Sequence, residues 1–361
     1  MIGSSGWLLL TAELVALTAT SPRLWRASRG GRQLLSQSAV SSDEAAWISV
    51  VIPARNESRR IAECIAPLIG ARGIREVIVV DDQSSDDTAT IARNLGATVV
   101  SGAPLPEGWV GKIWALHQGI QVAVGEVIVT LDADARPDSS LPFVAATAFA
   151  ESGAKLATVA PRFRVTSVAG RWLHAAMLTS LVYRYGAGSG TASHDSVANG
   201  QCMVFRRDDA VREEWCVAVK SHIIEDVALL RHLVRNGAHV EMFDGSRLLA
   251  VQMFEGFTET LRGWGRSLPL SDVDRPLRQW LYLLTTALTL VAPLWLVVSG
   301  MATPVSYLLL AVRLGVLFGT RRAYEQGGVG YWLSPIADLF VWVVVAKGTL
   351  SPSREWRGRK Y

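Results

Sequence analysis

Two aspartates separated by one residue end an apolar, strand-like run of the sequence. The run VIVTL is followed by Asp132 and Asp134. Like charges this close repel each other, and burying them unpaired is costly. Two carboxylates at a strand end can instead hold a hard cation such as Mg²⁺ or Mn²⁺, which takes its remaining ligands from water and substrate phosphates. The pattern is also good turn chemistry, so by itself it is weak evidence for a metal site.

Two further acidic pairs stand at the ends of expected elements. Asp81 and Asp82 close another apolar run, and Glu225 and Asp226 open an amphipathic, helix-like segment. A positioned carboxylate can act as a general base and accelerate a reaction by about 10²–10⁴-fold. Acids at a helix start also compensate the helix dipole, so the second pair alone would favour a structural role.

The elements that position these acids alternate between strand and helix. Apolar runs predict strands at 47–54, 75–82, 97–102 and 126–132, and helical spacing predicts helices at 56–70, 86–96 and 113–125. Repeated strand–helix–strand units with continuously apolar strands indicate a mostly parallel sheet covered on both faces. Ligands of such sheets bind at the carboxyl ends of the strands, where both aspartate pairs lie. Further on, we expect a strand running into a helix at 199–211, helices at 223–237 and 256–268, and a strand at 238–244.

The sequence argues against several classes of protein. GAGSG (186–190) lacks the spacing of a dinucleotide-binding loop, GWVGK (108–112) is not a P-loop, and neither H-E-x-x-H nor G-x-S-x-G occurs. The three widely spaced cysteines include no C-x-x-C and favour a reducing compartment without a zinc site. The net charge is +4, but no interleaving of basic and aromatic residues indicates a nucleic-acid partner.

Hydrophobic runs gather near both ends of the chain. Residues 280–300 carry no charge over about 20 residues, the length that spans a bilayer. Shorter runs at 304–319, 332–350 and 6–21 contain Arg313, Asp338 and Glu13, respectively. A signal peptide is disfavoured because no basic region precedes the first run and arginines follow it. We expect four regions: an N-terminal membrane helix (1–22), a basic linker (23–46), a catalytic domain (47–270) and a C-terminal membrane region (271–361).

Arginines indicate the orientation of these segments. Arg23, Arg26, Arg29 and Arg32 follow the first run, which predicts a cytoplasmic side there. Strict alternation through three C-terminal spans would place the basic tail outside, so one run is expected to be re-entrant or interfacial. The sequence thus predicts a multi-pass protein of the cell membrane with its catalytic domain facing the cytoplasm, and it leaves the number of complete spans open.

Five segments in a fixed order carry a resemblance to a known family. The chain is similar to the family 2 inverting glycosyltransferases over roughly residues 47–270, which implies the α/β GT-A nucleotide-diphospho-sugar transferase fold. The segments are VVIPARNE (50–57), VIVVDDQSSDDT (77–88), GKIWALHQGI (111–120), TLDAD (130–134) and IED (224–226).

The resemblance implies a role for each candidate residue. On the donor side, Ala54 and Glu57 would line the base and ribose, Asp82 would accept a hydrogen bond from the base, and Lys112 would face ribose or phosphate. Asp132 would lie near the ribose and the metal, and Asp134 would bind the metal directly. Asp226 would be the general base, in preference to Glu225.

The segment LRGWGRSL (261–268) replaces the Q-x-x-R-W motif of many processive relatives. By resemblance, Trp264 would pack against the acceptor, and Arg262 or Arg266 would pair with the diphosphate. The missing glutamine argues against processive polymer synthesis. Together with PEGWVGKIWAL (106–116), this segment looks most like the membrane-bound glycosyltransferases that act on carotenoid or hopanoid lipids.

The resemblance therefore implies inverting transfer of one sugar from a UDP- or GDP-sugar to a membrane lipid such as a carotenoid or another isoprenoid, with Mg²⁺ or Mn²⁺ as cofactor. One alternative is transfer to a polyprenyl phosphate, for which a base is hardly needed. A non-enzymatic alternative is a membrane scaffold that binds nucleotide sugars. The particular sugar, nucleotide and lipid, and the oligomeric state, stay open.

Overall fold

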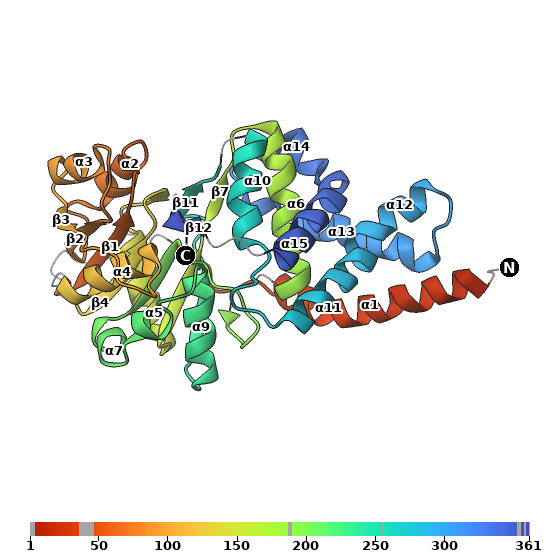
Figure 1. The fold of residues 1–361 in the computed structure, drawn as a ribbon, viewed down its shortest axis with the longest axis horizontal. Helices are drawn as coiled ribbons and strands as arrows, with labels where there is room; N and C mark the ends of the chain where they lie inside the picture. The colour runs from red at the N-terminus through yellow and green to blue at the C-terminus, as the bar shows by residue number, and fades with distance from the viewer. Residues whose placement is uncertain are drawn as a thin grey trace. The chain divides into compact units, whose positions relative to one another are not determined.

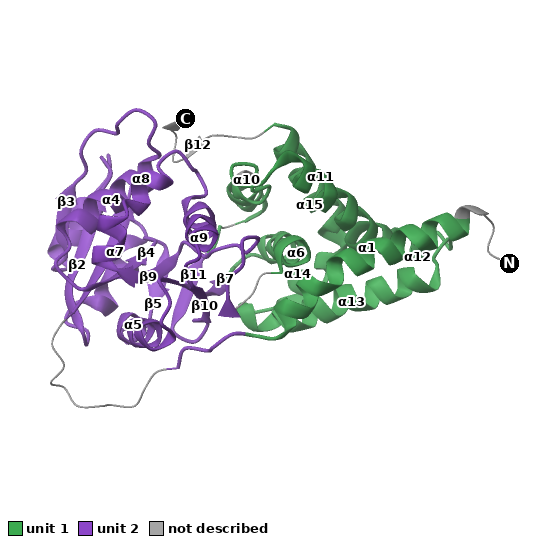
Figure 2. Ribbon diagram, turned by 90° about the horizontal axis from the view of Figure 1, so that it is seen from below, with its two compact units in different colours: residues 1–30, 164–188, 253–354 green, residues 31–163, 189–252, 355–361 purple. Residues whose placement is uncertain are grey.

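The computed structural model describes residues 4–35, 47–186, 190–254, 256–351, 355–356 and 359–360. The chain divides into two compact units, which Figure 2 shows in different colours. The sheet unit comprises residues 31–163, 189–252 and 355–361. The helical unit comprises residues 1–30, 164–188 and 253–354.

An eight-stranded sheet forms the centre of the sheet unit, in the order β3-β2-β1-β4-β9-β6-β10-β8 (Figure 1). Neighbouring strands are parallel from β3 to β4 and between β6 and β10, whereas β9 and β8 run antiparallel to their neighbours. The predicted, mostly parallel sheet is confirmed. Its strands are β1 (Ile48–Ala54), β2 (Ile74–Asp81), β3 (Thr98–Ser101), β4 (Val127–Leu131), β6 (Leu156–Ala160), β8 (Gly190–Thr191), β9 (Cys202–Arg206) and β10 (Val240–Asp244).

Helices cover both faces of this sheet. Successive residues of β1 point into different cores: Val50 and Ile52 pack with α2 and α5, and Val51 packs with α4 and α9. All residues of β1 are buried, as the continuous apolar run predicts. The helices are α2 (Ile61–Ile65), α3 (Thr88–Asn94), α4 (Gly111–Val122), α5 (Leu141–Ser152), α7 (Arg207–Arg212), α8 (Trp215–Ala218) and α9 (Glu225–Arg235).

Shorter strands form two further small sheets. β5 (Ala135–Pro137), β11 (Leu249–Gln252) and β7 (Arg162–Arg164) form a three-stranded sheet, and β12 (Glu355–Trp356) pairs with β13 (Arg359–Lys360). β5 begins directly after Asp134, and its Ala135 lies opposite Val251 of β11. This pairing fixes the backbone immediately beyond the two aspartates of the D-x-D segment.

The helical unit is built around α6 (Val168–Tyr185). Leu173 and Met177 of α6 share a buried core with Leu283 and Val341. The other helices are α1 (Ser4–Ser28), α10 (Gly256–Ser267), α11 (Pro276–Thr286), a π-helix (Ala287–Val291), α12 (Ala292–Val298), α13 (Pro304–Thr320), a 3-10 turn (Arg321–Ala323), α14 (Gly328–Trp332), a 3-10 turn (Ser334–Ala337) and α15 (Asp338–Leu350).

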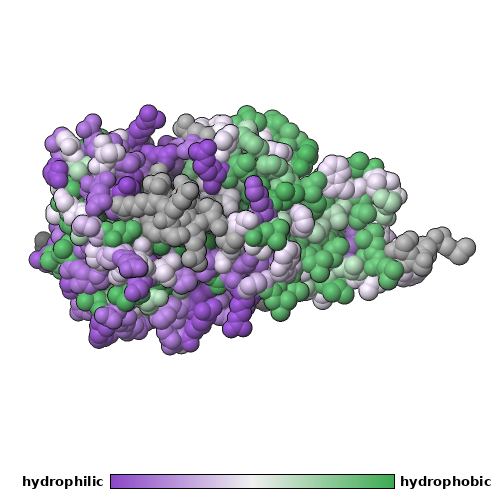
Figure 3. Space-filling model, viewed as in Figure 1, coloured by the Kyte–Doolittle hydropathy of each residue, from purple (hydrophilic) through white to green (hydrophobic). Residues whose placement is uncertain are grey.

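Apolar side chains gather on the surface of the helical unit, whereas the sheet unit shows mostly polar ones (Figure 3). Among the described helices, two are long and apolar enough to cross a membrane: Pro276–Val298 and Pro304–Ala323, with mean hydropathies of 2.0 and 1.2. They contain most of the predicted 280–300 run and all of the 304–319 run. Length and composition alone select these helices, so they are weak evidence for membrane crossing.

Two other predicted membrane segments look different in the structure. The 332–350 run is divided between a 3-10 turn and α15, whose 13 residues extend only about 20 Å and fall short of a bilayer core of about 30 Å. α1 continues to Ser28, beyond the expected end at residue 22, and therefore contains Arg23 and Arg26. It is not among the candidate spans.

Three buried charged residues inside the apolar runs, Glu13, Arg313 and Asp338, have polar partners. The buried carboxylate of Glu13 accepts hydrogen bonds from the hydroxyls of Thr303 and Ser306, at 2.5 and 2.6 Å. Arg313 donates to both carboxylate oxygens of Asp338, at 2.7 and 3.0 Å. Partners of this kind are what make ionisable groups tolerable in apolar surroundings.

The boundary between the units differs from the one we expected. Residues 164–188 and 253–270 fall in the expected catalytic domain, yet α6 and α10 belong to the helical unit. α6 buries side chains around most of its circumference, including Leu173, Ala176 and Tyr183. A helix of this kind takes its partners from the whole chain, so its own sequence does not indicate which unit it joins.

Candidate active site

A lysine joins two acids at the carboxyl edge of the sheet. Asp132 follows the buried strand β4, Lys112 lies in the first turn of α4, and Glu225 begins α9. The Nζ atom of Lys112 lies 2.9 and 3.2 Å from the two carboxylate oxygens of Asp132, and 2.8 Å from Oε1 of Glu225. The structure thus brings together three predicted site residues that stand up to 113 positions apart in the chain.

Burial and charge shape the ionisation of this cluster. Burial disfavours the ammonium of Lys112, but the neighbouring Asp132 and Glu225 carboxylates outweigh it and raise the Lys112 pKa well above its ordinary value. Burial raises the pKa of Glu225 and of Asp226, and Lys112 counteracts part of both shifts. Lys112 therefore remains a cation, whereas the two acids are easier to protonate than exposed ones.

Asp226 is held by backbone groups. Its Oδ2 accepts a hydrogen bond of 2.7 Å from the N–H of Gly200, and its Oδ1 accepts one of 2.8 Å from the N–H of Val227. Each carboxylate oxygen can accept more than one hydrogen bond, so this arrangement leaves capacity for a proton. A half-buried carboxylate with a raised pKa and a fixed orientation suits a general base.

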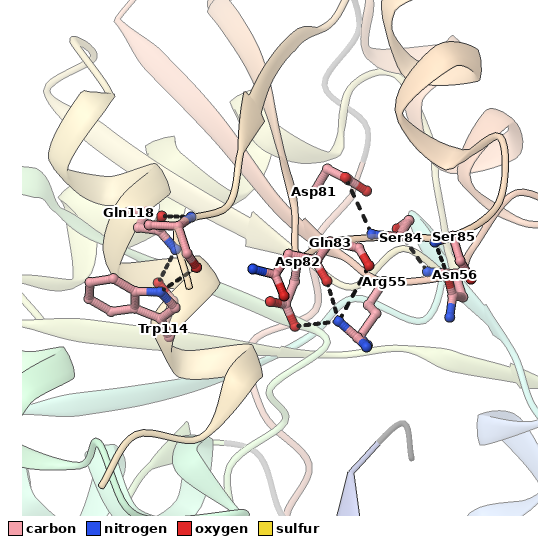
Figure 4. Close-up of polar contacts among 10 residues, drawn as sticks. Arg55, Asn56, Asp81, Asp82, Gln83, Ser84, Ser85, Trp114 and Gln118 are labelled. Atoms are coloured by element: carbon pink, nitrogen blue, oxygen red, sulfur yellow. Dashed lines mark hydrogen bonds and ion pairs between the residues drawn. The ribbon is translucent and has the colours of Figure 1, made fainter. Parts of the chain in front are cut away.

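The loop before α4 is anchored to that helix, and this anchoring places Lys112. The indole N–H of Trp114 donates to the carbonyl of Ala103 at 3.1 Å, and the side chain of Gln118 accepts from the N–H of Ala103 at 2.7 Å (Figure 4). At the other end of the loop, the N–H of Val110 donates to the carbonyl of Lys220 at 2.8 Å.

Hydrogen bonds join the loop after β1 to the loop after β2 (Figure 4). Arg55 donates to the carbonyl of Asp82 at 2.5 Å and lies 3.7 Å from its carboxylate. Asn56 takes a left-handed backbone conformation with φ of 54°, and its side chain accepts from the N–H of Ser85 at 2.8 Å. This hydrogen bond ties the loop after β1 to the loop after β2.

Three of the predicted donor-binding residues meet at these loops. The N–H of Asp82 donates to the carbonyl of Ala54 at 2.8 Å, and that of Glu57 donates to the hydroxyl of Thr88 at 2.8 Å. All three side chains are buried. β1 lies between β2 and β4, so the carboxyl ends that carry Ala54, Asp82 and Asp132 share one edge of the sheet.

Asp132 and Asp134 offer an oxygen-only donor set. Burial raises the pKa of the Cys64 thiol, Arg136 lowers it, and Asp134 and Asp132 raise it further. Among the described residues, no group of three or more His, Cys, Asp or Glu side chains converges to hold a metal ion. Two carboxylates fit Mg²⁺ or Mn²⁺ only if substrate phosphates and water supply the remaining ligands. Such an ion would share Asp132 with Lys112.

The remaining predicted residues lie on α10 of the helical unit. Arg262 is exposed, and the ring of Trp264 meets the buried His174 edge-on, with 4.9 Å between the ring centroids. The side chain of Arg266 lies outside the described residues. The roles of these three residues toward diphosphate and acceptor stay predictions.

Sequence reasoning missed several residues that hold the site together. Arg55 lies within the quoted VVIPARNE segment, but no pattern indicated that it contacts Asp82. Gly200 and Gln201 were read only as the start of a strand, although the N–H of Asp132 donates to the carbonyl of Gln201 at 3.1 Å. Such contacts leave no local signal in the sequence because they depend on which segments become neighbours.

This fold and its row of acids define the class of nucleotide-diphospho-sugar transferases with a GT-A fold. The chain is similar over 96% of its length to the mannosyltransferase PcManGT from Pyrobaculum calidifontis, solved in complex with GDP-Man and Mn²⁺; the match covers 99% of that chain, with 16% identity and a TM-score of 0.55. Residues 49–212 match the model of Glycosyl transferase family 2. The chain therefore carries a family 2 glycosyltransferase domain, as its motifs predict.

Two curated relatives share one name. The 4,4'-diaponeurosporenoate glycosyltransferase of Staphylococcus haemolyticus is 29% identical over 230 residues, which are 61% of this chain and 60% of that protein. The enzyme of the same name from Staphylococcus aureus (strain USA300) is 26% identical over 343 residues, covering 87% of this chain and 88% of that protein. The similarity to the second relative thus extends beyond the family 2 domain.

Replacing Lys112 by methionine is expected to destabilise the protein. The side chains of Lys112 and Glu225 are only 17% and 6% exposed, and removing one partner of a buried ion pair costs about 3–5 kcal/mol. Burial raises the folded-state pKa of Glu225 above its unfolded value, so without the cation the loss should grow as pH rises through that pKa. Urea unfolding of K112M at mildly acidic and mildly alkaline pH measures this. K112M/E225Q is the control and should recover much of the loss; equal stability of K112M and wild type would contradict the ion pair.

Proposed function

We propose that this protein transfers a single sugar, with inversion, from a nucleoside-diphosphate sugar to an isoprenoid lipid of the carotenoid type. The observation that carries the proposal is the acid cluster at the sheet edge, where Lys112 bridges Asp132 and Glu225 beside the fixed Asp226. The family 2 domain supports glycosyl transfer, and the two relatives named for a carotenoid acceptor support the lipid class.

The proposed step is a single displacement. As the acceptor hydroxyl oxygen forms its bond to the anomeric carbon, Asp226 accepts the hydroxyl proton, and the bond from that carbon to the diphosphate oxygen breaks. The cationic Lys112 is proposed to face the diphosphate or ribose. A divalent cation held by Asp132 and Asp134 would neutralise charge on the departing nucleoside diphosphate. Ala54, Glu57 and Asp82 are proposed to hold the nucleoside.

The helical unit is proposed to anchor the protein in the cell membrane. Pro276–Val298 and Pro304–Ala323 would form a pair of spans that returns the chain to the side from which it entered. Arg275 and Arg278 stand at its start and Arg321 and Arg322 at its end, which favours the cytoplasm for both ends. Because α15 is too short to cross, the basic tail and the sheet unit would share that side.

Labelled donors test the proposed reaction. The full chain, purified in detergent, is incubated with labelled UDP-glucose or GDP-mannose, carotenoid acceptors and Mg²⁺ or Mn²⁺, and the lipid phase is separated. We expect label in a lipid product with the anomeric configuration inverted. Sugar nucleotide binding without any labelled lipid, over all donors and metals, would favour the scaffold alternative.

Transfer should depend on pH through Asp226. Burial raises its pKa above the ordinary aspartate value, while Lys112 and the N–H groups of Val227 and Gly200 limit the rise. The carboxylate must be ionised to accept a proton, so kcat should increase with pH through this raised pKa and then level off. Rates measured between about pH 4.5 and pH 8 at saturating donor and acceptor report this limb. A flat profile would argue against a carboxylate base.

A further inference from the structure

The backbone segment Asn199–Gln201 links the two acidic sides of the site. The carbonyl of Gln201 accepts a hydrogen bond of 3.1 Å from the N–H of Asp132, on the donor side. The adjacent residue, Gly200, donates its N–H to Oδ2 of Asp226 at 2.7 Å, on the acceptor side. Two consecutive residues therefore contact both the strand-end acid and the proposed base.

Gly200 has no room for a side chain. A Cβ atom built at this position would lie 2.8 Å from both Cβ and Oδ2 of Asp226, and 2.9 Å from its Cγ. The three nearest atoms all belong to Asp226, so a methyl group here would act on that side chain before any other. Gly200 is buried and its backbone is not in the left-handed region, so backbone strain does not explain the glycine.

The side chain of Asp226 has little room to move away from an added methyl group. Its Oδ1 is held by the N–H of Val227 at 2.8 Å, and its Cα lies in the first turn of α9, whose Leu229 and Leu230 are buried in the core. Rotation about the side-chain bonds moves Oδ2 but leaves Cβ in place, so relieving both contacts also requires the backbone of Asp226 to shift, and either movement disturbs the hydrogen bond from Gly200. Shifts of about 1 Å in catalytic groups can cost about 10²-fold in rate.

We propose that Gly200 is a positioning residue for Asp226: its N–H orients the carboxylate, and its missing side chain lets that carboxylate sit against the Asn199–Gln201 segment at a fixed spacing from Asp132. The inference rests on the proposed role of Asp226 as base. Gly200 itself touches neither donor nor acceptor in this scheme.

Replacing Gly200 by alanine tests the inference. We expect kcat to fall by about 10²-fold while the affinity for the nucleoside diphosphate, measured by calorimetry with UDP and GDP in Mn²⁺, stays unchanged. The matched control is G125A, because a Cβ at Gly125 would lie 2.5 Å from the backbone nitrogen of Ser49, near the opposite end of β4 from Asp132. G125A should lower the melting temperature without lowering kcat of the folded fraction.

A double-mutant cycle separates this inference from the proposed function. If Gly200 acts through Asp226, the G200A change should lower the residual rate of D226N little or not at all. An active G200A beside an inactive D226N would overturn the positioning role alone, whereas an active D226N would overturn the base. If G200A does not fold, G200A/D226G removes all three close contacts and should melt close to D226G alone; a much lower melting temperature would also overturn the inference.

Discussion

Replacing Asp226 by asparagine should lower kcat by about 10²–10⁴-fold. The amide keeps the size of the side chain and can still accept the hydrogen bond that Gly200 donates, but it cannot take a proton from the acceptor. Donor affinity should change little, because Asp226 is proposed to face the acceptor and Lys112 keeps its contacts with Asp132 and Glu225. Initial rates with labelled donor and lipid acceptor, together with calorimetry of UDP or GDP, separate these two quantities.

The matched control is D208N. Asp208 also lies in the first turn of a helix of the sheet unit, α7, but its side chain is 89% exposed and its ion pair is with Arg207. We expect D208N to keep the wild-type rate. A D226N enzyme that retained much of its activity would favour an acceptor that is already an anion, as in transfer to a polyprenyl phosphate, because such an acceptor hardly needs a base.

Replacing Asp134 by alanine should weaken metal-dependent donor binding by about 10²-fold or more and reduce transfer accordingly. With this residue gone, only Asp132 of the D-x-D pair remains to hold the cation, and Lys112 already contacts both of its carboxylate oxygens. A metal ion contributes several kcal/mol when it stabilises phosphoryl charge, and about 1.4 kcal/mol corresponds to tenfold in affinity. Calorimetry of UDP and GDP binding with Mn²⁺, with Mg²⁺ and with EDTA measures the effect.

Asp138 supplies the control for this experiment. It belongs to the same acidic stretch, but its Oδ1 accepts hydrogen bonds from the N–H and hydroxyl of Ser140, at 2.9 and 2.6 Å, within its own turn. D138N keeps an oxygen acceptor and should bind the donor as the wild type does. If EDTA left the donor affinity of the wild-type protein unchanged, a metal at Asp132 and Asp134 would be excluded from donor binding.

The local pattern of the sequence determined the elements of the sheet unit and the acids at their ends. Continuous apolar runs predicted β1, β2 and β4 to within a residue or two, because strands buried on both faces need apolar side chains at every position. The positions of Asp82 and Asp132 then followed, since parallel strands end at one edge. The order of five short motifs was enough for the family.

The tertiary structure alone decided which groups touch. The bridge from Lys112 to Asp132 and Glu225 joins three segments, and the contact of Gly200 with Asp226 joins a fourth to the start of α9, with no local signal for either. The placement of α6 and α10 in the helical unit could likewise not be predicted from the sequence, because an apolar helix is compatible with many partners. Residue type and spacing act over a few positions of the chain, whereas contacts between distant segments exist only once the whole chain has packed.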